Sequence, residues 1–157
     1  MRWRMRMFRT SLRSTRRATS GTAAIEFAIA APMLSILVFG AAELGYSAYQ
    51  AMEVQDAVEA GALYVSKHGW DSSGIAAAVV NATDVTGLTA SPAPAQFCGC
   101  PSTTGVATAT CASTCTGGNP AGQYVQINAT LTRKSLIPNS GLPLPTAFSA
   151  QSIVRIK

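Results

Sequence analysis

A run of 16 residues without a charge, residues 27–42, most constrains what this chain can fold into. Extended back to Ala23, the segment has 20 residues with Glu26 as its only charge, about the length of helix that crosses the hydrocarbon core of a bilayer. Charged residues make up only 12 % of the chain, about half the share in an ordinary soluble domain. The segment is therefore either a membrane-spanning helix or a secretion signal.

The positive charge of the chain precedes this run. Seven of the 12 basic residues, all arginines, lie before residue 18, whereas residues 18–157 carry five basic and seven acidic side chains. A slightly acidic folded part does not suit a phosphate backbone, so we expect no nucleic-acid partner. The positive-inside rule keeps the basic leader in the cytoplasm and exports the C-terminal part to the periplasm or cell exterior. This predicts a single-pass protein of the inner (cell) membrane.

Three interpretations of the segment remain open. A signal peptidase can cut after Ala42, where Gly40 and Ala42 are small, and release a soluble binding protein. A twin-arginine signal fits less well, since no apolar pair follows the two arginines at positions 16 and 17. In the third, Gly21 precedes a cleavage site and Glu26 is the fifth residue of the processed chain, which is the type IV prepilin pattern.

Three short motifs favour the third interpretation: Gly21-Thr-Ala-Ala-Ile-Glu-Phe-Ala28, Ala31-Pro-Met-Leu34 and Gly40-Ala-Ala-Glu-Leu-Gly45. Together they resemble the N-terminal region of TadE-like minor pseudopilins of the tight-adherence (Flp) type IV pilus system, over about residues 16–65. The resemblance implies cleavage after Gly21 by a prepilin peptidase and a role in assembling an adhesive pilus. The implied partners are that peptidase, other pilins and pseudopilins, pilus assembly proteins and the lipid bilayer.

Cleavage after Gly21 would leave a free ammonium at Thr22, and these two residues and Glu26 form the expected processing site. We expect Glu26 to pair with the Thr22 ammonium of a neighbouring subunit, because an unpaired buried charge is costly. Alternatively, Glu26 extends to the cytoplasmic interface and Gly21 is a flexible spacer.

Four residues are expected to take part in subunit packing along the helix: Glu26, Phe27, Pro32 and Glu43. Pro32 should bend the helix, as neighbouring groups in membranes tolerate. Glu43 lies 17 residues after Glu26, about 25 Å along a helix, which places it at the opposite membrane interface. It is interpreted there as an anchor, with docking of another subunit as the alternative.

The part after the span divides into a helical stem, residues 46–86, and a β-rich domain, residues 87–157. Residues 46–67 predict a continuation of the helix, with Tyr49, Met52, Ala60 and Leu63 on a shared spacing, and His68-Gly69-Trp70 as its end. Ser72 and Ser73 precede a second, short helix over residues 74–80.

The β-rich domain begins with a loop-rich stretch, residues 87–122, that contains a linker at 91–94 and a short strand at 106–111. Residues 124–133 alternate apolar and polar side chains, as a half-buried strand does, and residues 147–157 repeat the pattern. With a leader at 1–21 and a membrane helix at 22–45, the expected fold class is α+β. A long N-terminal helix precedes a small antiparallel sheet braced by disulfides, which resembles a pilin.

Cys98, Cys100, Cys111 and Cys115 all lie in the exported part, where disulfides persist. Cys98 and Cys100 are too close for an unstrained bond with each other, so each is expected to bond one of the other two, with the connectivity open. A zinc site is the alternative, although its usual spacing is Cys-x₂-Cys. No cofactor or metal is expected.

Catalytic chemistry is sparse in this sequence. The chain has one histidine, His68, and no arrangement of nucleophile, base and orienting group, so we predict no enzyme activity and no small-molecule substrate.

Overall fold

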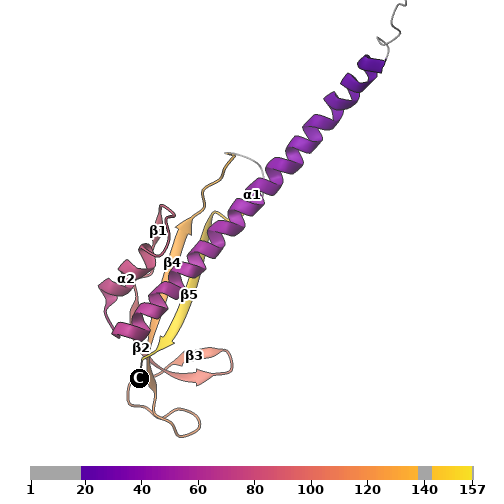
Figure 1. Cartoon of the computed structure of the whole chain (residues 1–157). Coiled ribbons are helices and arrows are strands. Elements are labelled where there is room, and N and C mark those ends of the chain that lie inside the picture. Colours follow the sequence, from indigo (N-terminus) through magenta and orange to yellow (C-terminus); the bar gives the residue numbers. More distant parts are fainter. Residues whose placement is uncertain (1–18, 138–142, 157) are drawn as a thin grey trace, which may run out of the picture. The chain divides into compact units, whose positions relative to one another are not determined.

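The computed structural model of the chain describes residues 19–137 and 143–156. In this part the helices are α1 (Thr19–His68) and α2 (Ser72–Val80) (Figure 1). The strands are β1 (Leu88–Thr89), β2 (Ala95–Ser102), β3 (Gly105–Thr108), β4 (Gly122–Thr132) and β5 (Ala147–Arg155). The predicted α+β class, a long N-terminal helix before a small antiparallel sheet, is confirmed. The chain divides after Ala41 into two compact units, and the predicted leader falls largely outside the described residues.

Strand β4 organises the sheet, because three other strands pair with it in antiparallel register. β5 pairs along β4 from Tyr124 to Thr132, β2 pairs with its first half, and β1 pairs with Thr130 and Leu131. β3 completes the sheet as the partner of β2. The predicted strands at 124–133, 147–157 and 106–111 correspond to β4, β5 and β3, the last shorter than expected.

The loop-rich stretch predicted for residues 87–122 needs correction. Residues 95–102, which include two cysteines, form strand β2 within the sheet, and residues 88–89 form β1. Sequence alternation is weak there because Gly99 and Pro101 interrupt it. The structure explains why position 99 is a glycine. A Cβ there would lie 2.5 Å from Val106 Cγ1 and 2.8 Å from Ala107 O, so the close approach of β3 excludes a side chain.

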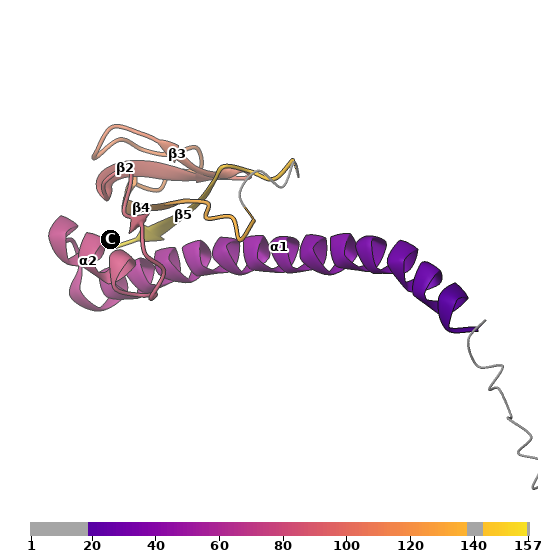
Figure 2. The ribbon, with the colours of Figure 1, turned by 90° about the horizontal axis from the view of Figure 1, so that it is seen from above.

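One face of the sheet packs against the helices. In Figure 2 the sheet lies as a layer over the part of α1 that follows Ala41. The core consists of buried residues from α1, α2, β1 and β4: Val54, Ala57, Val58, Val65, Ile75, Val79, Leu88, Val125, Ile127, Ala129 and Leu131. The apolar positions of the predicted alternation in β4 are confirmed, since Val125, Ile127, Ala129 and Leu131 are at most 1 % exposed. The polar positions differ from the prediction at Asn128, which is 7 % exposed and therefore buried as well.

The buried face of α1 is not the stripe that the sequence spacing indicates. Tyr49, Met52 and Leu63 are 45–56 % exposed, whereas Val54, Ala57 and Val58 form the contact with the sheet. Small and β-branched side chains of α1 therefore face the core. At Gly61 the approach to other elements is close, since a Cβ there would lie 2.7 Å from Val79 Cγ2 and 3.0 Å from Ile127 Cγ2.

The ends of the two helices follow local sequence signals. α1 ends at His68 and Gly69 follows with φ of 78°, a conformation that favours glycine, so the predicted stop is confirmed. α2 is capped by Asp71 rather than by a serine, because Asp71 Oδ1 accepts a hydrogen bond from Ser73 N at 3.2 Å. Hydrogen bonds lower the pKa of Asp71 below its ordinary value. The largest effect comes from the hydroxyl of Ser73 and the next from the backbone amide of Gly74.

Candidate functional site

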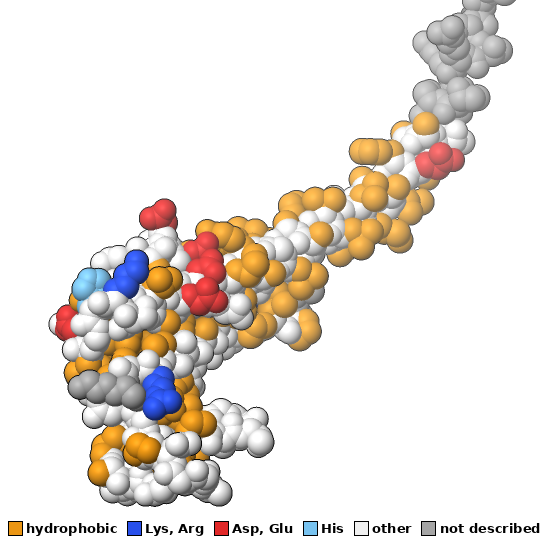
Figure 3. All heavy atoms as spheres, turned by 60° about the horizontal axis from the view of Figure 1, so that its bottom comes forward, with side chains coloured by type: hydrophobic (Ala, Val, Ile, Leu, Met, Phe, Trp, Pro, Cys, Tyr) orange, Lys and Arg blue, Asp and Glu red, His pale blue; other side chains and the backbone are white. Residues whose placement is uncertain are grey.

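The segment of α1 before Ala42 exposes its hydrophobic side chains to an unusual degree. Nine large apolar residues are 56–72 % exposed: Ile25, Phe27, Ile29, Met33, Leu34, Ile36, Leu37, Val38 and Phe39. Hydrophobic side chains also predominate along this segment on the face shown in Figure 3. The helix is long and apolar enough to cross a membrane. Because apolar surface of this extent is unfavourable in water, the segment fits a single-pass membrane anchor.

The residues expected to form the processing site lie at the beginning of this segment. Gly21, Thr22 and Glu26 are all exposed residues within α1, which begins at Thr19. Pro32 lies inside the helix without ending it. Phe27 is 72 % exposed and is therefore available to a lipid or a neighbouring helix.

Glu43 differs from these residues because its side chain is only 1 % exposed. One carboxylate oxygen, Oε1, accepts hydrogen bonds from Arg133 Nη2 at 2.5 Å and from Ser135 Oγ at 2.6 Å. The other, Oε2, accepts from the backbone amides of Leu136 at 3.0 Å and Ile137 at 3.3 Å. The segment that follows β4 thus surrounds the carboxylate and neutralises its charge.

Gln50 makes a second connection between α1 and the same segment. Its side chain is 1 % exposed, and its amide forms a two-way pair with the backbone of Lys134. Gln50 Oε1 accepts from Lys134 N at 2.9 Å, and Gln50 Nε2 donates to Lys134 O at 2.9 Å. Glu43, Gln50 and residues 133–137 are together called the polar clamp below.

Sequence reasoning anticipated one member of this clamp. Glu43 was expected at a membrane interface, as an anchor or a docking site, and the structure gives its carboxylate partners within the same chain. Arg133, Ser135 and Gln50 were missed. The contacts join residues 84 to 94 positions apart, and no periodicity or spacing signals a pairing over that distance.

The four cysteines form two disulfides, Cys98–Cys111 and Cys100–Cys115. Cys98 and Cys100 each bond one of Cys111 and Cys115, as predicted, and the structure supplies the connectivity. The zinc alternative is wrong, because none of the four cysteines is a free thiol. Within the described residues, no group of three or more His, Cys, Asp or Glu side chains is arranged to hold a metal.

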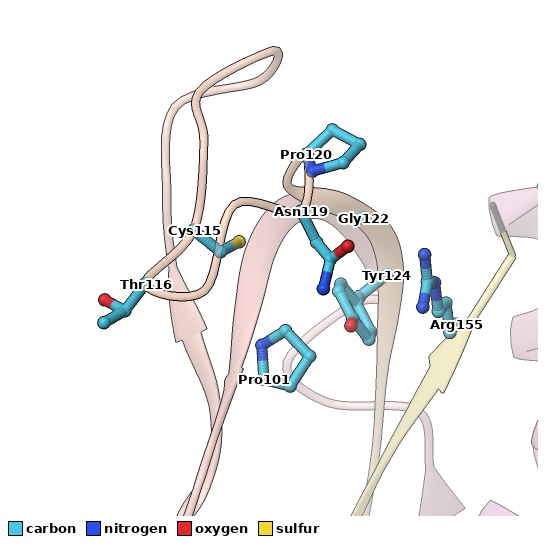
Figure 4. Close-up of a pocket in the computed structure, with 8 residues that line it drawn as sticks. All are labelled: Pro101, Cys115, Thr116, Asn119, Pro120, Gly122, Tyr124 and Arg155. Atoms are coloured by element: carbon cyan, nitrogen blue, oxygen red, sulfur yellow. The ribbon is translucent and has the colours of Figure 1, made fainter.

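A hollow of about 380 Å³ lies beside the second disulfide. Figure 4 shows Asn119, Tyr124 and Arg155 around it, from the loop before β4, from β4 and from β5. These groups are two neutral hydrogen-bonding side chains and one cation. They can contact a polar group, but among the residues lining this hollow there is no base next to a nucleophile.

Comparison with known proteins gives one match to a protein family. Residues 21–63 match the model of the family described as TadE-like protein. The match covers about a quarter of the 157 residues and confirms the resemblance seen in the sequence motifs. No curated protein and no solved structure matches the chain.

Proposed function

We propose that this chain is a minor pseudopilin that assists the assembly of a tight-adherence (Flp) type IV pilus, and that a prepilin peptidase cleaves it after Gly21. The observation that carries the proposal is the TadE-like match over residues 21–63. The match begins at the glycine that precedes the proposed cut. Cleavage there would leave the matched segment, without Gly21, at the N-terminus of the mature protein.

The exposed apolar residues of α1 support a role in helix packing. Nothing in the described chain covers side chains such as Phe27 and Ile36, which are 72 % and 71 % exposed. Lipid covers them while the protein is in the membrane, and helices of other pilus subunits cover them when it leaves. This role is structural rather than enzymatic, and its partners are other pilins and pilus assembly proteins.

Glu26 is the residue that we assign to recognition between subunits. It is the only charged side chain in residues 23–42, and it is exposed in the single chain. A carboxylate that enters a helical stack needs a cation beside it, and the new Thr22 ammonium of a neighbour supplies one. Glu43 has a different task, because its carboxylate is already paired within the chain.

The N-terminal sequence and intact mass of the protein from its native membranes test the processing step. We expect a chain that starts at Thr22, with a mass four hydrogens short because of the two disulfides. A Gly21→Leu variant should remain unprocessed. A start at Glu43 would contradict the proposal and would identify a soluble exported protein released by signal peptidase.

The pairing of Glu26 is tested by Glu26→Gln in the native host. We expect normal processing and membrane insertion but loss of pili, counted by electron microscopy. The control is Glu59→Gln, the same chemical change at an exposed position of α1 outside the apolar segment. Normal piliation of the Glu26→Gln strain would overturn the pairing but not the processing.

A further inference from the structure

We infer that residues 133–137, which follow β4, are a membrane-contacting element, in which the Leu136 side chain inserts into the interfacial region of the bilayer. The inference depends on the membrane anchor and not on a role in a pilus. It follows from the position of Glu43 directly after the charge-free run of α1, from the exposure of Leu136, and from the charges around Leu136.

The clamp sets the depth of the segment relative to the membrane. The charge-free run ends at Ala42, and Glu43 is the next residue. A charged residue directly after a membrane-spanning run lies at the boundary between hydrocarbon and water. The amide nitrogens of Leu136 and Ile137 lie 3.0 Å and 3.3 Å from Glu43 Oε2. These two residues are therefore held at the level of that boundary.

Leu136 is exposed although its backbone is fixed. The side chain is 54 % exposed, and Leu44, which follows Glu43, is 53 % exposed. Ser135 fixes the local turn, because its Oγ lies 2.7 Å from Ile137 O as well as contacting Glu43. Two exposed leucines next to the end of an apolar span are covered if they contact lipid, which is favourable because it removes apolar surface from water.

The charges of the segment agree with an apolar contact. The Arg133 cation is paired with Glu43, whereas the exposed Lys134 ammonium donates to the neutral Thr86 Oγ1 and keeps its charge. Residues 133–137 therefore offer the membrane a leucine side chain and one cation without a carboxylate partner, rather than a cluster of cations. We expect their contact with lipid to depend little on salt or on anionic headgroups, unlike that of a polybasic element.

The test uses the full chain, reconstituted into phosphatidylcholine vesicles. Trp3 and Trp70 are first replaced by Phe, and Leu136→Trp is then compared with Thr103→Trp, an exposed position in the turn between β2 and β3. Lipids brominated near the headgroup should quench the tryptophan at position 136 at least about twofold more than the one at position 103, with blue-shifted emission. Equal quenching at the two positions, or none at 136, would overturn the inference.

A second measurement keeps the chain unaltered, in case Leu136→Trp does not fold. In nanodiscs with a headgroup-attached nitroxide lipid, the labelled methyl groups of Leu136 should be broadened. Those of Leu63, which is 56 % exposed and lies much further along α1, should not be broadened. Sharp Leu136 signals in the same sample would also contradict membrane contact. The intact mass of the sample shows whether the anchor is present. Cleavage after Ala42 would remove the anchor, and sharp Leu136 signals would then reflect processing rather than the absence of contact.

Discussion

Glu43 and Gln50 show how single polar side chains can connect two distant parts of a chain. Both are 1 % exposed, and both find their partners in residues 133–137. A buried carboxylate or amide is tolerated only when its hydrogen bonds are complete, and here each oxygen of the carboxylate accepts two. The polar clamp therefore favours one position of the segment after β4 against α1.

Replacement of Gln50 by Leu should destabilise the unit formed by residues 42–157 by about 1–3 kcal/mol, because the backbone N–H and C=O of Lys134 would lose their partners while the side-chain volume stays similar. Urea denaturation in detergent measures the change in the free energy of unfolding. The matched control is Gln55→Leu, since Gln55 is exposed on the same helix. Equal stability of the two variants would show that the hydrogen bonds of Gln50 contribute nothing.

At the scale of elements, α1 combines two different kinds of packing. Up to Ala41 its large apolar residues are exposed, and after that residue its small and β-branched residues are buried against β4 and α2. Glycine is unfavourable inside a helix. At position 61 a larger residue would collide with Val79 and Ile127, and this contact explains the glycine.

We expect Gly61→Ala to lower stability by about 1–3 kcal/mol, because the new methyl group overlaps packed side chains on two elements. Gly45→Ala is the control, since nothing lies within 4 Å of a Cβ at Gly45. That variant should be neutral or more stable by about 0.5–1 kcal/mol, from helix propensity alone. Thermal unfolding followed by circular dichroism compares the two. A stable Gly61→Ala variant would mean that the helix moves away from the sheet at little cost.

At the scale of the molecule, the unit formed by residues 42–157 depends on cross-links as well as on its core. Both disulfides connect β2 to the segment between β3 and β4, which contains few buried residues. Burial alone therefore contributes little order to this segment. The two bonds close loops with sequence separations of 13 and 15 residues, and each is expected to contribute roughly 2–4 kcal/mol.

Removal of one disulfide by Cys100→Ser with Cys115→Ser should lower the free energy of unfolding by roughly 3 kcal/mol, as expected for a loop of about 15 residues. Limited proteolysis should then cut first between residues 109 and 121. The Cys98→Ser with Cys111→Ser variant serves as the comparison and should behave similarly. Unchanged protease resistance in both variants would mean that local packing alone holds this segment.

Local features of the sequence correctly predicted much of the fold. The apolar run predicted a helix long and apolar enough to cross a membrane, the alternation after residue 123 predicted β4 and β5, and Gly69 predicted the end of α1. Each of these signals acts within one element, through hydrophobic periodicity or the conformational freedom of glycine. The resemblance of residues 21–63 to TadE-like proteins is of the same kind, since it depends on a contiguous motif.

Only the tertiary structure decided which face of α1 is buried, which cysteines pair and where Glu43 finds its partners. Spacing favoured Tyr49, Met52 and Leu63 as one face, but the face that packs against the sheet carries small and β-branched side chains instead. The polar clamp joins residues about 90 positions apart, so its contacts exist only after β4 has packed against α1. Local sequence determines the elements because it acts on neighbouring residues, whereas contacts between distant residues depend on packing that no local pattern encodes.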